Sequence, residues 1–286
     1  EKNIKLEDFF PPDFIVEYTG QIRAWFYVLH VISTALYDNI AFKNVVVTGV
    51  ILGTDGRKMS KNFGNYPDPK EMLEKYGGDA LRLYLMGSPV MNGEDILISE
   101  DQYKDQVRSL MLTLWNVFNF FTSYANLDKW SPAAGTEYKV QSTDILDKWI
   151  LARLKQTINL VTAGLEKYDS VSAVAGIKNF IGNDLSLWYI RRSRDRVGPA
   201  AGSSKDKEAF YSTAYRVLCT ISKLLAPLAP FLSELIYKNL TKEESVHLAF
   251  WPDSRPLNDQ DTELLNEMIL VRKIVEKVHA ERKEKR

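Results

Sequence analysis

The second part of this sequence repeats apolar residues at helical spacing and contains no strand-like run. From about residue 99 onward, apolar side chains recur every three or four positions, as they do at Val107, Leu110 and Leu114. Similar series run through about 150–165, 171–188, 210–224 and 262–286. Helices of this kind bury their apolar faces against one another when short loops join them. Residues 99–286 therefore predict an all-α helical bundle.

Residues 1–98 alternate strand-like and helical segments instead. Residues 13–18 are a short apolar run, a helical series starts near Arg23, and residues 44–52 ("NVVVTGVIL") form a β-branched run. A continuous apolar strand is typical of a parallel sheet that is covered on both faces. We therefore expect residues 1–98 to form an α/β, Rossmann-like part and residues 99–286 the bundle, with helix predominating overall.

Capping residues mark the helices that link these two parts. Asp68 and Pro69 are typical of a helix start, and Gly77 of a left-handed exit. A second short helix is expected over about 79–86. Ser99 and Gln102 have the spacing of a capping box, so the first helix of the bundle is expected to begin there.

Composition narrows the classes of function. Positive and negative side chains number 37 each, so net charge gives no argument for a polyanionic partner, although a neutral total can conceal a local basic patch. Cys219 is the single cysteine and lies in an apolar helical series, where a buried small hydrophobe is expected. One cysteine excludes an internal disulfide, and the three scattered histidines predict no protein-bound metal. No apolar run is long enough to span a membrane, so no membrane partner is expected.

The stretch "GTDGRKMSKNFGN" (residues 53–65) is the clearest chemical signal. It follows the predicted strand at 44–52, and ligands of open α/β sheets bind at the carboxyl ends of strands. Asp55 and Gly56 predict a tight turn, and Lys58 and Lys61 then stand three residues apart. Two ammonium groups over such a crevice can neutralise a polyphosphate. The alternative is a solvated basic loop, which is the commoner meaning of a bare K-x-x-K pattern.

"KMSKN" after a buried strand resembles the KMSKS signature of class I aminoacyl-tRNA synthetases. The segments "VEYTGQIRAWF" (16–26), "NYPDPKEMLEKYGGDALRLYLMGSP" (65–89) and "LSLWYIRRSRDR" (185–196) resemble isoleucyl-tRNA synthetases, as do "LLAPLAPFLSELIY" and "SVHLAFWPD" further along. The resemblance covers about residues 10 to 280. It implies the end of a catalytic domain that joins isoleucine to tRNA(Ile) with ATP and Mg²⁺, followed by an anticodon-binding bundle.

The resemblance also implies roles for single residues. Lys58 and Lys61 would be catalytic, and the ATP-binding set would be Gly49, Lys58, Met59, Ser60 and Lys61. Glu17, Gln21 and Trp25 would hold the aminoacyl adenylate, with Trp25 as a wall of the aliphatic pocket. If the family resemblance is set aside, the sequence predicts that Glu17 is an exposed glutamate at a strand end and that Trp25 is a core residue. Gly49 then indicates a bulge or a bend.

Four arginines crowd the end of the predicted third bundle helix. Arginine clusters suit phosphate backbones, and the resemblance implies tRNA contacts for Arg191, Arg192, Arg194 and Arg196. The alternative is a solvated helix end with local ion pairs.

The sequence also departs from the family pattern. Gly20, Ala24, Thr48 and Asn62 stand where many relatives carry other residues, and no HIGH-type motif or editing insertion occurs. Because that motif is missing, we expect a piece of the ligase that is inactive alone. We also expect it to be monomeric and cytoplasmic. A valyl- or leucyl-tRNA synthetase, or a non-catalytic tRNA-binding paralogue, remains an alternative.

Overall fold

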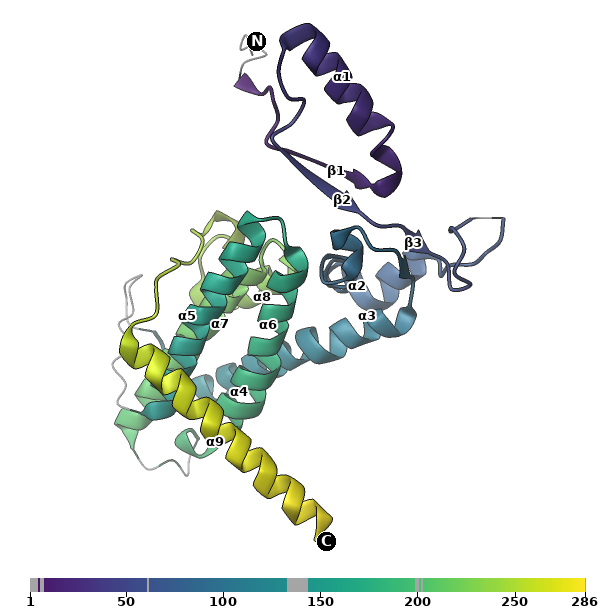
Figure 1. The fold of residues 1–286 in the computed structure, drawn as a ribbon. Coiled ribbons are helices and arrows are strands. Elements are labelled where there is room, and N and C mark those ends of the chain that lie inside the picture. Colours follow the sequence, from purple (N-terminus) through teal and green to yellow (C-terminus); the bar gives the residue numbers. More distant parts are fainter. Residues whose placement is uncertain are drawn as a thin grey trace.

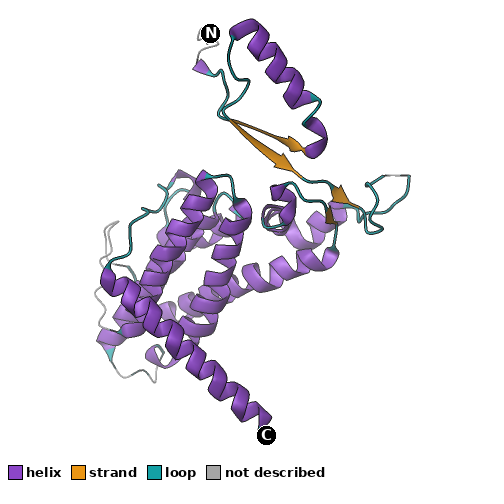
Figure 2. Cartoon of the chain, viewed as in Figure 1, coloured by secondary structure: helices purple, strands orange, loops and turns teal. Residues whose placement is uncertain are grey.

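The computed structural model describes residue 5 and residues 8–60, 62–132, 144–198, 201 and 203–285. A small lobe built from β1, α1 and β2 projects from a larger helical body, and α9 crosses that body and extends past it (Figure 1). Strands occur only in the first hundred of the described residues, and helices make up nearly all the rest (Figure 2). The predicted fold class, an α/β part followed by a helical bundle, is confirmed.

The small lobe is one strand–helix–strand unit. β1 (Phe14–Tyr18) pairs in parallel with β2 (Asn44–Thr48), and Glu17 lies opposite Val47. α1 (Trp25–Tyr37) connects the two strands, because a parallel pair needs a long crossover. The burial expected on both faces is wrong for the described part of the chain, since Val16 and Val45 are about half exposed. Little of the described chain covers the sheet besides α1.

The predicted strand over 44–52 is broken in the middle. β2 ends at Thr48, and Ile51–Leu52 form a separate short strand, β3, parallel to β4 (Ile96–Leu97). The break lies where the chain meets the segment after η3 (Pro89–Asn92), because a Cβ on Gly49 would lie 1.9 Å from the Glu94 carbonyl oxygen. The amide of Gly49 donates to the Val90 carbonyl, and that of Val50 to the Asp95 carboxylate. Only glycine permits this approach.

Of the two helix starts predicted between the α/β part and the bundle, the first has the capping contact that the sequence predicts. α2 (Pro69–Met86) begins where Asp68 accepts a hydrogen bond from the Lys70 amide at 2.8 Å. Gly77, at φ 80°, separates its two halves, as its left-handed preference predicts. The predicted capping box at Ser99 is wrong, because the Ser99 side chain makes no capping bond to α3 (Glu100–Gln106).

The bundle consists of long rods around one apolar core. The first runs through α3, the π-helical stretch η4 (Val107–Met111) and α4 (Leu112–Leu127). α5 (Ile145–Glu166) follows, and α6 (Ser170–Asn179) continues as the π-helical stretch η5 (Phe180–Ile190). After the short turn η6 (Arg194–Arg196) come α7 (Ser204–Leu225), α8 (Pro230–Thr241), the turn η7 (Val246–Leu248) and α9 (Asp259–Glu284). Their inward faces form one cluster that includes Trp149, Phe180, Tyr189 and Phe210.

Polar contacts fasten α2 to the bundle. Asp79, only 3% exposed, accepts hydrogen bonds from the amides of Phe231 and Leu232 at the start of α8. A carboxylate at this position accepts hydrogen bonds from amides that have no partner within the helix, and its negative charge is attracted to the positive end of the helix dipole. Arg82 donates to the carbonyls of Pro227 and Leu228. α2, which follows the lysine-bearing loop, is therefore anchored to the bundle.

Candidate functional site

The loop over residues 53–65 leaves the carboxyl end of β3 and folds back on itself. Gly56 has φ 78° and its amide bonds the Gly53 carbonyl, so the predicted tight turn is confirmed. The Asp55 carboxylate accepts from the Arg57 amide at 3.0 Å and pairs with the Arg57 guanidinium. Hydrogen bonding from the Asn65 amide, and then from Arg57, lowers the pKa of Asp55 to about 2. The carboxylate therefore stays ionised and holds the turn at all ordinary pH values.

Asn65 is the hub of this loop. Its side-chain amide donates to Asp55 Oδ1 at 2.8 Å and to the Lys58 carbonyl at 3.3 Å, while its Oδ1 accepts from the Ser60 amide. Its carbonyl accepts from the Thr54 amide, and the residue is 7% exposed. Asn65 therefore ties both arms of the loop to one buried side chain. Sequence reasoning passed over this residue, although an Asn after Gly64 at the loop end was a local signal.

The lysine loop reaches the ends of β1 and β2. The Lys58 ammonium lies 5.9 Å from the centre of the Tyr18 ring, and Tyr18 is the last residue of β1. Lys58 is exposed, while Met59 and Ser60 are partly covered. Lys61, the second predicted catalytic lysine, lies outside the described residues. In the described part of the loop, one free ammonium therefore faces the strand ends where a ligand was expected.

The predicted adenylate-binding residues lie around the same strand ends. Glu17 is half-buried, and one of its oxygens accepts from the Tyr18 amide at 3.0 Å. Gln21 Oε1 accepts from the Trp25 amide at the first residue of α1. Trp25 is 45% exposed and therefore is not a core residue here. Gly49 is buried, and its close neighbour is the Glu94 carbonyl, which supports the bend reading on structural grounds alone.

Three of the four predicted tRNA-binding arginines point outward. Arg191, Arg192 and Arg194 are exposed where the η5 rod ends. The Arg192 guanidinium lies 3.3 Å from the centre of the Trp188 ring and so stacks on the turn before it. Partial burial of the guanidinium and then the charges of Arg191 and Arg272 lower the pKa of Arg192, although the group stays protonated. The stacked guanidinium also donates from Nη1 to the Leu187 carbonyl at 3.3 Å, so both contacts hold it in place at the helix end.

Arg196 points inward instead. Its guanidinium forms a fork on the Asp147 carboxylate at 2.7 and 2.8 Å, and it also bonds Asp206. The Arg196 side chain is 10% exposed and that of Asp147 is fully buried. Tyr189 donates its hydroxyl to the same carboxylate at 2.7 Å. The donors of Arg196 are thus used inside the bundle, so its predicted tRNA contact has no support from this geometry.

Two arginines that sequence reasoning did not single out complete the outward cluster. Arg153 of α5 bonds Asp184 at 2.6 Å, and Arg272 of α9 pairs with the other oxygen of that carboxylate. Arg272 also lies 5.2 Å from the centre of the Trp188 ring. The chain distance from Trp188 to Arg272 is 84 residues, so no local pattern could have linked them.

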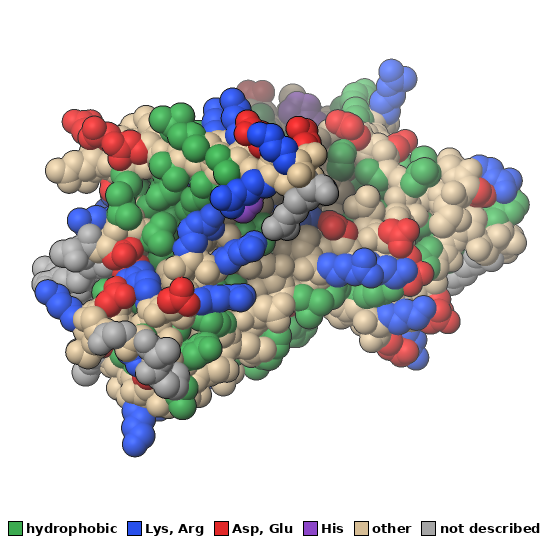
Figure 3. Space-filling view, turned by 90° about the horizontal axis from the view of Figure 1, so that it is seen from below, with side chains coloured by type: hydrophobic (Ala, Val, Ile, Leu, Met, Phe, Trp, Pro, Cys, Tyr) green, Lys and Arg blue, Asp and Glu red, His purple; other side chains and the backbone are tan. Residues whose placement is uncertain are grey.

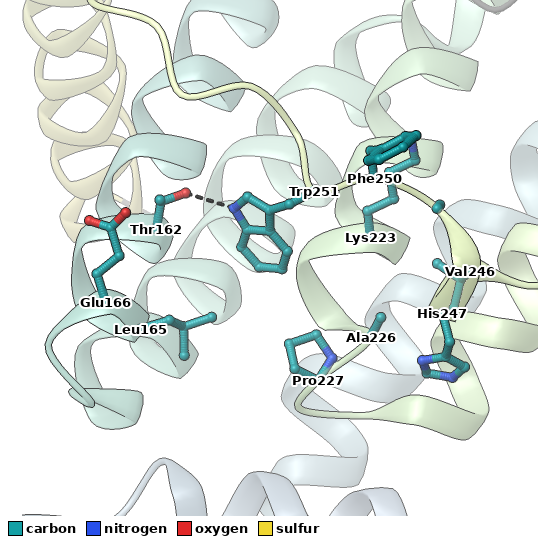
Figure 4. A pocket seen from close by; sticks show the side chains of 11 residues that line it. Thr162, Leu165, Glu166, Lys223, Ala226, Pro227, Val246, His247, Phe250 and Trp251 are labelled. Carbon is teal, nitrogen blue, oxygen red and sulfur yellow. Dashed lines mark hydrogen bonds between the residues drawn. The ribbon is translucent and has the colours of Figure 1, made fainter. Parts of the chain in front are cut away.

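A hollow of about 590 Å³ lies between the end of α5, the end of α7 and residues 246–251 (Figure 4). Trp251 closes one side, and its indole nitrogen donates to Thr162 Oγ1 at 2.9 Å. Lys223, Glu166 and His247 stand at the rim of an otherwise apolar wall. The segment "SVHLAFWPD" therefore supplies one wall of this hollow.

The face of the molecule that is seen from below carries mixed charge (Figure 3). In the view from below, basic, acidic and apolar side chains lie among one another rather than in one large field of a single sign (Figure 3). Across the residues that the structure describes, no three His, Cys, Asp or Glu side chains gather as metal ligands do. No helix in the described ranges is long and apolar enough to cross a membrane.

Two protein families match this chain. The family described as "tRNA synthetases class I (I, L, M and V)" matches residues 1–98, and "Anticodon-binding domain of tRNA ligase" matches residues 147–286. Among solved structures, the Mycobacterium tuberculosis methionyl-tRNA synthetase has a TM-score of 0.65 at 22% identity, covering 82% of this chain and 46% of that one. The Agrobacterium radiobacter K84 LeuRS has 0.63 at 20% identity, covering 89% and 29%. These two likenesses concern the fold alone.

Sequence relatives are closer. An isoleucine–tRNA ligase from Leifsonia xyli is 44% identical over 254 residues, which is 88% of this chain and 22% of the relative. Its counterpart in Mycobacterium tuberculosis is 40% identical over 277 residues, which is 97% of this chain and 25% of the relative. The chain thus spans about a quarter of the length of the curated relatives that it matches. It belongs to the class I aminoacyl-tRNA synthetases and is a partial counterpart of the isoleucine–tRNA ligases.

Proposed function

We propose that this chain is the part of an isoleucine–tRNA ligase that carries the lysine loop of the activation site and a tRNA-binding helical bundle. The observation that carries the proposal is the 40–44% identity to isoleucine–tRNA ligases over most of this chain. The Lys58 ammonium, 5.9 Å from the centre of the Tyr18 ring at the end of the strand that carries Glu17, supports it. We place the domain boundary between residues 98 and 99.

In the proposed reaction, the isoleucine carboxylate attacks the α-phosphorus of ATP and pyrophosphate leaves. Lys58 and Lys61 supply positive charge to the phosphate oxygens, where negative charge builds up as the bond to pyrophosphate breaks. Mg²⁺ accompanies ATP, and no protein ligands for it are proposed in this chain. A hydroxyl of the terminal ribose of tRNA(Ile) then attacks the aminoacyl carbonyl of the adenylate, an ester bond forms, and AMP leaves.

The remaining residues of the strand ends position the amino acid. The Glu17 carboxylate accepts the α-ammonium group of isoleucine, with Gln21 beside it. Trp25, about half exposed in the described chain, walls the aliphatic side chain. Gly49 follows the end of β2 and is placed in the ATP-binding set by the family resemblance and not by its geometry, because the Glu94 carbonyl already fills the side where its Cβ would lie. Exposed apolar side chains on β1, α1 and β2 fit a catalytic half that this chain shares with the rest of the ligase.

The bundle binds the tRNA through the outward arginines. Arg191, Arg192 and Arg194 contact phosphates, whereas Arg196 holds the bundle together. In the complete protein these contacts orient the tRNA so that its acceptor end reaches the adenylate.

ATP–pyrophosphate exchange tests this function. The complete protein should exchange pyrophosphate when isoleucine is added, and this chain alone should not, because it lacks a HIGH-type motif. Valine or leucine as the better substrate would change the amino acid but keep the reaction. No exchange with any of the three would favour a non-catalytic paralogue, whose support is the set of departures at Gly20, Ala24, Thr48 and Asn62.

A further inference from the structure

The Tyr18 ring lies between the strand ends and the lysine loop. Tyr18 is the last residue of β1 and is partly buried, and the Lys58 ammonium lies 5.9 Å from the centre of its ring. An aromatic face attracts a cation at distances up to about 6 Å, so the two side chains interact. The proposed function uses this ammonium but gives the ring beneath it no role.

The main chain of Lys58 is already fixed by its neighbours. An antiparallel bridge joins Lys58 to Leu52, the last residue of β3. The Lys58 carbonyl accepts a hydrogen bond from the Asn65 side chain at 3.3 Å, and the preceding Arg57 carbonyl accepts one from the Gly53 amide at 2.8 Å. The freedom that remains to Lys58 is therefore that of its long side chain, and ordering such a side chain on binding opposes binding.

The adjacent cation, Arg57, is held within the loop instead. Its guanidinium pairs with the Asp55 carboxylate at 2.8 Å and lies 5.0 Å from the centre of the Phe63 ring. The carboxylate neutralises the charge of Arg57 where the loop turns. Of these two neighbouring cations, Lys58 is thus the one that is directed at the strand ends.

Gly20 gives the Tyr18 ring its place. A Cβ on Gly20 would lie 2.4 Å from Tyr18 Cε2 and 2.7 Å from the Tyr18 hydroxyl oxygen. Gly20 has no left-handed φ, so an alanine fits the backbone there and the ring at the end of the Tyr18 side chain would have to move. Gly20 is also one of the positions at which this sequence departs from the family pattern. The ring and the glycine therefore belong together as one local arrangement.

We propose that Tyr18 is a positioning residue for Lys58 and that Gly20 makes room for its ring. This inference rests on the proposed function and adds which side chain holds the lysine where the phosphates of ATP arrive. The ring attracts one side of the ammonium, and phosphate oxygens approach it from the other side, so the ring contact is kept when ATP binds. ATP then meets an ammonium that is already in place, and less side-chain freedom is lost on binding.

ATP–pyrophosphate exchange by the complete protein, at saturating isoleucine and varied ATP, tests the proposal. Tyr18→Leu removes the aromatic face, Tyr18→Phe keeps it, and Gly20→Ala displaces it. Tyr18→Leu is also made in a Lys58→Met background, in which the side chain keeps its bulk but loses its charge. Far-ultraviolet circular dichroism checks that each variant is folded, and the KM for isoleucine reports on the amino-acid pocket beside Glu17.

Tyr18→Leu and Gly20→Ala should each lower kcat/KM for ATP about two- to fivefold, which is what an exposed cation–π contact is worth. Tyr18→Phe should restore most of the rate, because the ring face and not the hydroxyl attracts the ammonium. The KM for isoleucine should not change. In the Lys58→Met background, Tyr18→Leu should have no further effect, because the ring then has no cation to hold.

Three results of these assays would overturn the proposal. Wild-type kcat/KM for ATP in Tyr18→Leu would show that the ring does not assist Lys58. The same loss from Tyr18→Leu in both backgrounds would show that the ring acts on another group. A weaker affinity for isoleucine with unchanged kcat/KM for ATP would assign Tyr18 to the amino-acid pocket.

Nuclear magnetic resonance of this chain, with carbon-13 in its lysines, separates the inference from the proposed function. The Tyr18 ring should shift the ε-methylene signal of Lys58, and Tyr18→Leu and Gly20→Ala should both abolish that shift. If the complete protein shows no exchange with isoleucine, valine or leucine, the proposed function fails, while a shifted Lys58 signal still supports the contact. A Lys58 signal that is identical in the wild-type chain and in Tyr18→Leu would overturn the inference, whatever the exchange assay shows.

Discussion

Replacing Arg196 with alanine leaves the Asp147 carboxylate buried without its guanidinium partner. In the native chain Arg196 bonds both oxygens of Asp147 at 2.7 and 2.8 Å and bonds Asp206 as well. Asp147 is fully buried, and the Tyr189 hydroxyl that also bonds it carries no charge. Removal of one partner of such a pair costs about 3–5 kcal/mol, because the other charge stays buried.

Urea unfolding, followed by far-ultraviolet circular dichroism, measures this cost. Arg196→Ala should lose about 3–5 kcal/mol of unfolding free energy. The loss for Arg196→Lys should be smaller than that for Arg196→Ala but larger than zero, since an ammonium keeps the charge but cannot bond both carboxylate oxygens as the guanidinium does. Arg191→Ala is the matched control, and its exposed side chain should change stability by less than about 0.5 kcal/mol.

A loss below about 1 kcal/mol for Arg196→Ala would refute the buried network. Equal destabilisation by Arg191→Ala would show that the rod end, and not the inward ion pair, is what the substitution disturbs. Either result would return Arg196 to the group of outward arginines that are proposed to contact tRNA.

Three further predictions follow from single side chains. Asn65→Ala should speed hydrogen exchange of the loop amides over 53–65 by about ten- to a hundredfold, since about 1–3 kcal/mol of local hydrogen bonding is lost. Asn65→Asp should lose at least as much protection, because its carboxylate cannot donate to Asp55 and repels it; unchanged exchange in both variants would remove Asn65 as the hub. Hydrogen bonds from Lys207 and Tyr211 lower the pKa of Asp128 in the folded chain. The stability that this carboxylate gives the fold is therefore complete above the unfolded pKa of about 3.9 and is lost as the pH falls through the lower folded pKa. Urea titrations between pH 2 and 7 should therefore show a flatter acid limb for Asp128→Asn, and an unchanged limb would contradict the assignment. Burial raises the pKa of the Cys219 thiol to about 12, so at pH 8 only about one thiol in ten thousand is ionised and labelling by a disulfide reagent should be far slower than for free cysteine.

Helix positions followed from the sequence because they depend on local periodicity. The series through Leu110 and Leu114 and the capping residue Asp68 are read within a few turns of chain, and both lie where the pattern indicates. The break at Gly49 was missed as a strand boundary, because the cause is the Glu94 carbonyl 45 residues later. The glycine in this run indicated a bend, but the sequence did not show that the bend divides the strand between two sheets.

The site was predictable to the extent that its residues are contiguous. The lysine loop was found because Lys58 follows a strand within six residues. The inward orientation of Arg196 was not predicted, because its main partner, Asp147, lies 49 residues earlier on another helix.

The central claim is that the lysine loop acts on ATP during activation of isoleucine. The most direct measurement compares the complete protein with its Lys61→Ala variant, using isoleucine-dependent ATP–pyrophosphate exchange for the rate and equilibrium titration for isoleucine affinity. A transition-state role predicts that the exchange rate falls by far more than isoleucine affinity. Equal losses in both, or an exchange rate that does not change, would contradict the claim.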